Sequence, residues 1–209
     1  MPVPAKKADQ YMDMLNDVLQ TGNRLGDIDR FNITEHINRI MGTNPIDALL
    51  LKAFLAHIDG KFKDSSLAFE TAISINDKDP FVHTNYARML CDHGLTSDAA
   101  KEVRKALECC KNANEWSPLG YLAASAFSIH DIELLEEISQ IAERLNIKDS
   151  VFKHAALTCN LEGVSDEDCV SLLESSISDE ELRYFSVEIT PERWANMTAL
   201  ADRLSKYVD

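Results

Sequence analysis

The sequence predicts an all-α fold, a solenoid of antiparallel helical hairpins, and two observations lead to this prediction. Small residues recur at a shift of 34 residues, a period typical of stacked helical hairpins. They are Ala53, Gly60 and Ala72, followed by Ala87, Gly94 and Ala106. The chain has only 7 Gly and 6 Pro among its 209 residues, which leaves little room for long loops. Most of the prolines fall where helices should begin or end: Pro45, Pro80, Pro118 and Pro191.

Residues 1–45 are predicted to form a degenerate N-terminal hairpin. Gly26 lies 34 residues before Gly60. One apolar stripe precedes Gly26 and another follows it, as expected of two amphipathic helices. The stripes are Met12, Leu15, Val18 and Leu19, then Ile33, Ile37 and Ile40.

Residues 46–113 contain the two clearest hairpins. Ala87 and Ala106 are expected where helices approach most closely, because a larger side chain there would push the helices apart. Gly94 is expected to end its helix in the left-handed backbone conformation, which costs Gly little. The preceding hairpin repeats these roles 34 residues earlier, and there Phe69 is the large side chain packed between helices.

The run from Asn85 to Gly94, with the Asp98-Ala99-Ala100 and Lys105-Ala106-Leu107 that follow it, resembles a tetratricopeptide repeat (TPR). This resemblance is clearest over residues 46–113. It implies about four to five hairpins whose first helices line a concave groove. In such proteins the groove binds a peptide or a helix of another protein.

Residues 114–176 are predicted to form two more degenerate repeats. The spacing from Ala106 to Ala142 is 36 residues, which implies a short insertion around residues 112–116. The glycine that ends the first helix of each clear hairpin is replaced near His130. These departures predict the same architecture with looser adherence to the repeat.

Residues 177–209 depart from the repeat. Residues 184–189 alternate apolar and polar side chains as one short strand would, and Thr190 followed by Pro191 predicts the start of a helix. This capping helix would cover the exposed core of the last hairpin, since solenoid ends need cover. Alternatively, the segment docks onto a partner or onto a second copy in a homodimer, because an isolated strand leaves backbone groups unpaired.

Charge is the second signal in the sequence. Thirty-five acidic residues against 21 basic ones give a formal charge of −14, which argues against binding nucleic acid through a general basic surface. Carboxylates concentrate between residues 161 and 192, where they form either a solvated face or an acidic docking surface for a basic partner. The candidates for docking are Asp166, Glu167, Asp168, Asp179 and Glu180.

The remaining motifs predict neither catalysis nor a cofactor. Phosphate loops, dinucleotide-binding glycine motifs and nucleophile elbows are all missing, so we expect no enzymatic activity. The five cysteines form an odd set without CxxC spacing and the six histidines are scattered, so we expect reduced thiols and no metal site. Apolar runs are too short to span a bilayer and the first residues do not resemble a secretory signal, so we expect a cytoplasmic protein without membrane insertion.

Binding to another protein is therefore the function that the sequence favours, in a groove whose positions follow from the TPR resemblance. Phe54, Phe81 and Tyr121 are expected at equivalent places in three successive hairpins. The full groove is Asn16, Gln20, Leu50, Phe54, His57, Phe81, Thr84, Arg88, Tyr121, Ser125, Lys153 and Leu157. One alternative is an acidic inhibitor, such as an antitoxin or immunity protein, or a secretion chaperone that masks a basic client. Another is a regulator that senses a peptide or small ligand in the groove.

Overall fold

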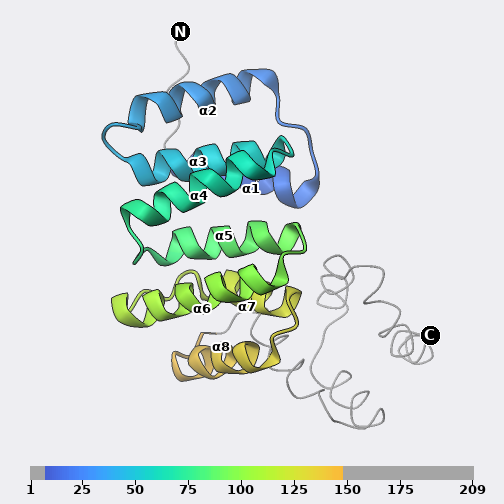
Figure 1. Cartoon of the computed structure of the whole chain (residues 1–209), viewed down its shortest axis with the longest axis vertical. Coiled ribbons are helices and arrows are strands. Elements are labelled where there is room, and N and C mark those ends of the chain that lie inside the picture. Colours follow the sequence, from blue (N-terminus) through green and yellow to red (C-terminus); the bar gives the residue numbers. More distant parts are fainter. Residues whose placement is uncertain (1–7, 148–209) are drawn as a thin grey trace, which may run out of the picture. The chain divides into compact units, whose positions relative to one another are not determined.

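The computed structural model describes residues 8–147, and all regular structure within them is helical (Figure 1). The helices are α1 (Ala8–Thr21), α2 (Asp27–Ile40), α3 (Pro45–Ile58), α4 (Phe62–Ile75), α5 (Pro80–Asp92), α6 (Thr96–Ala113), α7 (Leu119–Ser128) and α8 (Ile132–Arg144). The all-α class is confirmed for this part of the chain. The expected strand and capping helix at residues 177–209 lie outside it.

The chain divides into two units, Met1–Asp131 and Ile132–Asp209. The first contains α1 to α7, and the described part of the second is α8 with the turn that follows it. In the first unit, α3 packs along α4 and α5 along α6, each pair joined by a three-residue turn. α4 also contacts α5, both α5 and α6 contact α7, and α1 and α2 both contact α3.

The first helices α3, α5 and α7 end in the same way. Gly60, Gly94 and His130 follow them in the left-handed conformation, with φ of 69°, 70° and 57°. The next residue then donates its N–H to the carbonyl five residues earlier, the bond of a Schellman motif. These bonds are Lys61 to Ala56, Leu95 to Leu90 and Asp131 to Ala126, at 2.9, 2.9 and 3.1 Å. The left-handed backbone predicted at Gly94 is confirmed, and His130 adopts it in place of glycine.

The N-terminal helices do not follow the predicted spacing. Gly26, which the 34-residue shift aligns with Gly60, is the N-cap of α2 with an ordinary φ of −67°. The left-handed residue after α1 is Gly22, with φ of 66°. The alignment of Gly26 is therefore wrong, because five residues separate α1 from α2 where three separate α3 from α4.

The core of the first unit is built on the recurring small residues. Ala53, Ala72, Ala87 and Ala106 are all fully buried, as their recurrence predicts. Phe69 is also buried; its ring stacks on Tyr86 with centroids 5.2 Å apart and meets the edge of Phe54 at 6.1 Å. In the same hairpin the buried Ser65 hydroxyl donates to the Ala53 carbonyl at 2.9 Å, which ties α4 to α3.

A buried histidine joins α5 to α6 and to the loop before α5. His83 Nδ1 lies 2.6 Å from Glu102 Oε2, and its Nε2 lies 3.0 Å from the Asp77 carbonyl oxygen. Both partners are acceptors, so the doubly protonated ring satisfies both bonds. Burial lowers the pKa of His83, but the bonds to Glu102 and Asp77 outweigh it and raise that pKa above the ordinary histidine value.

The described cysteines are free thiols, as expected. Cys109 and Cys110 are buried and Cys91 is half-buried. Burial raises the pKa of Cys110 to about 11, so this thiol remains protonated at neutral pH. Cys159 and Cys169 lie outside the described residues.

Candidate functional site

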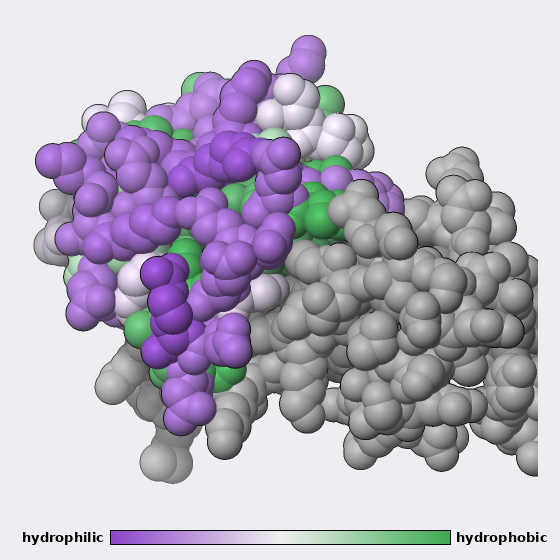
Figure 2. Space-filling model, turned by 90° about the horizontal axis from the view of Figure 1, so that it is seen from below, coloured by the Kyte–Doolittle hydropathy of each residue, from purple (hydrophilic) through white to green (hydrophobic). Residues whose placement is uncertain are grey.

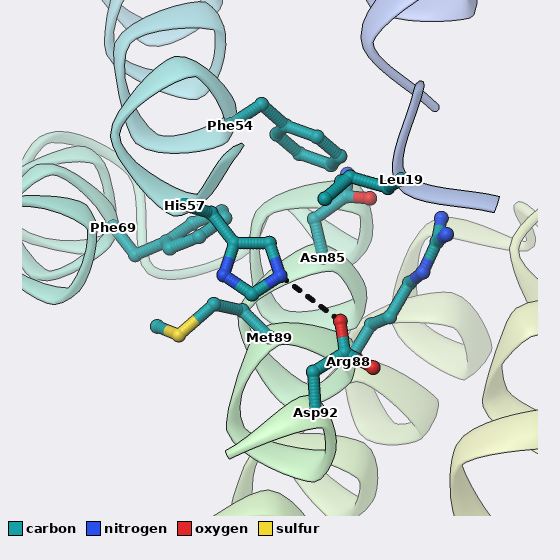
Figure 3. A pocket seen from close by; sticks show the side chains of 8 residues that line it. All are labelled: Leu19, Phe54, His57, Phe69, Asn85, Arg88, Met89 and Asp92. Atoms are coloured by element: carbon teal, nitrogen blue, oxygen red, sulfur yellow. Dashed lines mark hydrogen bonds and ion pairs between the residues drawn. The ribbon is translucent and has the colours of Figure 1, made fainter. Parts of the chain in front are cut away.

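A pocket opens where α1, α3, α4 and α5 meet (Figure 3). It encloses about 210 Å³ of empty space that opens to solvent. Four helices contribute its lining residues, which are Leu19, Phe54, His57, Phe69, Asn85, Arg88, Met89 and Asp92. Its floor is apolar and its rim is polar, a combination typical of sites that bind a ligand in a fixed orientation.

The apolar floor belongs to the core of the unit. Phe54, Phe69 and Met89 are all buried, and Phe54 is only 4% exposed. Leu19, from α1, packs against this cluster and is half-buried. The floor is therefore held by packing on three sides, which fixes its shape before any ligand arrives.

Arg88 supplies a positive charge at the rim. Its Nη1 donates to Asn16 Oδ1 at 3.0 Å, a bond between residues 72 positions apart. In Figure 3 the guanidinium points toward the α1 segment that carries Leu19 and away from Asp92. No carboxylate of residues 8–147 forms an ion pair with Arg88. A guanidinium has five N–H donors, so most of them remain for a ligand.

His57 closes the other side of the pocket. Its Nε2 lies 3.0 Å from Asp92 Oδ2, and its Nδ1 lies 3.3 Å from His93 Nε2. The ring of His93 in turn meets the edge of Phe62, with centroids 4.6 Å apart. Both nitrogens of His57 are thus engaged, so it orients the rim and is not placed to attack a substrate.

A polar stripe along α5 extends from this pocket. Phe81, Asn85, Arg88 and Asp92 are spaced four, three and four residues apart, which places them on one face of the helix. Asn85 donates its side-chain N–H to the Phe81 carbonyl at 2.9 Å. Phe81 is 44% exposed, and it is the large apolar side chain at the start of this face.

Four of the predicted groove residues come together at the pocket: Asn16, Phe54, His57 and Arg88. Leu50, Thr84 and Ser125 are buried instead, and the Thr84 hydroxyl donates to the carbonyl of Pro80 at 2.6 Å. Groove positions for these three are therefore wrong, because they face the neighbouring helices.

Tyr121, on α7, is 53% exposed but does not line the pocket. Phe54 lies six residues before Gly60, Phe81 thirteen before Gly94 and Tyr121 nine before His130. Equivalent places for the three aromatic residues are therefore ruled out. The other predicted site residues fall outside what the structure describes, and they are the Gln20 side chain, Lys153, Leu157, Asp166, Glu167, Asp168, Asp179 and Glu180.

Sequence reasoning missed Leu19, Asn85, Met89, Asp92 and His93 as parts of this site. Spacing alone could have found Asn85 and Asp92, since both share a helix face with Arg88. His93 has no such signal, because it follows α5 and reaches His57 only through the packing of two hairpins.

The described surface shows few other features that could bind a ligand. Hydrophilic residues cover most of the face drawn in Figure 2, and hydrophobic ones show only in small areas between them. Within residues 8–147, no three His, Cys, Asp or Glu side chains gather as metal ligands would. The helices of that range are too short or too polar to cross a membrane. No family model, curated protein or solved structure matches the chain.

Proposed function

We propose that this chain is a TPR-like scaffold of stacked hairpins that binds a peptide or a helix of a partner protein at the pocket of α1, α3, α4 and α5. The observation that carries the proposal is the convergence of Asn16, Phe54, His57 and Arg88 from three helices around one open pocket. The equivalent ends of α3, α5 and α7 support the repeat architecture.

The pocket favours one kind of partner segment. Phe54 and Met89 offer an apolar floor, so the segment should carry an apolar side chain. Arg88 offers unused donors beside this floor, so a backbone carbonyl or a carboxylate of the segment should lie next to that side chain. The alternative, an acidic surface that binds a basic client, concerns residues that the structure does not describe.

The test selects binders from a library of random peptides displayed on phage and measures each by fluorescence anisotropy. Arg88→Ala should weaken binding at least tenfold, since a hydrogen bond to a charged group contributes about 1.5–3 kcal/mol. Arg144→Ala, which removes the same charge from α8, should leave the affinity unchanged.

Asn16→Ala separates binding from folding. It breaks the same bond that Arg88→Ala breaks but keeps the guanidinium, so its affinity should stay within about threefold of wild type. The proposal fails if no peptide is enriched, or if the enriched peptides bind Arg88→Ala and wild type equally well.

A further inference from the structure

The contact between His57 and His93 joins two hairpins at the edge of the pocket. His57 lies near the end of α3, and His93 follows α5 immediately before Gly94. Their rings meet at a centroid distance of 5.1 Å, with Nδ1 of His57 3.3 Å from Nε2 of His93. The His57 side chain is only 11% exposed, so solvent cannot readily replace its partners.

Proton counting limits the charge that this pair can hold. The bond between two ring nitrogens needs one proton, and Asp92 accepts a second proton from His57 Nε2. When both rings are neutral, His57 donates to Asp92 and accepts from His93. One added proton is accommodated on the free nitrogen of His93, and all three groups stay connected.

A second added proton is not accommodated. It would place two N–H groups against each other across the 3.3 Å contact, and it would put two positive rings side by side. His93 must then turn away from His57 and from the edge of Phe62. Histidine is the side chain that changes charge between pH 5 and 8, so this change falls in an accessible pH range.

The charged groups around the pair leave this reasoning intact. Asp92 already accepts from His57, and Arg88 points away from Asp92 in Figure 3. Asp59, in the turn after α3, is already paired with both Arg30 and Lys61. Within α7 there is no charged side chain, and Asp131 after it pairs with Arg104 of α6. The acidic residues of α1, which packs on α3, are Asp9, Asp13 and Asp17.

We propose that the pair of His57 and His93 makes the pocket sensitive to pH, holding α3 and α5 together at neutral pH and releasing them when both rings are protonated. This proposal rests on the proposed function only for its effect on partner affinity. The coupling of the two rings is a property of the chain itself. Loss of the contact frees the His57 side of the rim, so partner binding weakens in acid.

The first experiment needs no partner. Imidazole nitrogen shifts of the full chain are followed by NMR from pH 8 to pH 5, in wild type and in His93→Gln. Wild type should show two separated protonation steps that both rings report, and the backbone amides of Asn85 and Met89 should move with the more acidic step. In His93→Gln, His57 should titrate in a single step and those amides should stay in place.

The second experiment uses a peptide selected for Arg88-dependent binding. Its affinity for wild type should fall about two- to tenfold between pH 7.5 and pH 5.5, the effect of losing one hydrogen bond. The affinity for His93→Gln should change less than twofold. Independent titration of the two rings, or an equal pH dependence in both proteins, overturns this proposal. Failure to select any peptide overturns the proposed function and leaves the NMR result as the test of the pair.

Discussion

Replacing Gly94 by Ala tests whether the left-handed turn after α5 is a true requirement of the fold. A Cβ built on Gly94 meets nothing within 4 Å, so the substitution adds no clash and its cost is conformational. An L-residue in left-handed backbone costs about 1–2 kcal/mol, and the lower chain entropy of Ala in the unfolded state offsets about 0.4–1 kcal/mol of that. The expected net loss of stability is about 1 kcal/mol.

Gly120→Ala is the matched control. Gly120 lies inside α7, its Cβ would also meet nothing within 4 Å, and its φ is not in the left-handed region. The same substitution there should raise stability by about 0.4–1 kcal/mol. Urea unfolding followed by circular dichroism would measure both variants. A Gly94→Ala protein as stable as wild type, or a destabilised Gly120→Ala, would refute the reasoning.

Two further predictions concern the core. Ala87→Leu should cost about 1–3 kcal/mol by overpacking, because Ala87 is fully buried between helices; a wild-type melting temperature would contradict the close packing of the repeat. The raised pKa of His83 means that its bond to Glu102 stabilises the fold fully below about pH 6.5 and less as the pH rises through the raised value. Glu102→Gln should therefore be clearly less stable than wild type at pH 6, with a smaller difference at pH 8, and a difference that grows with pH would contradict this.

Much of the helical arrangement could be predicted, because its determinants are local. Pro45 and Pro80 begin α3 and α5, and Pro118 is the N-cap of α7. The predicted insertion near residues 112–116 coincides with the end of α6, which has 18 residues where α4 has 14. A helix end depends on the φ that one residue can adopt, and a sequence displays that directly.

The site could be predicted only in part, because it depends on which face of a helix meets which neighbour. Leu50 and Phe54 lie one turn apart on α3 and are both buried, yet only Phe54 borders the pocket. That difference comes from the position of α1 relative to α3. The loop between α1 and α2 breaks the 34-residue spacing, so no repeat alignment could supply this position.

The bond between Asn16 and Arg88 ties the pocket to the docking of α1. Leu19 and Asn16 both come from α1, so the complete pocket exists only while α1 is docked. Helices near a terminus undock locally far more often than a whole domain unfolds, and amide hydrogen exchange measures that opening. A segment bound in the pocket must slow exchange of the α1 amides by the same factor by which it favours the docked state.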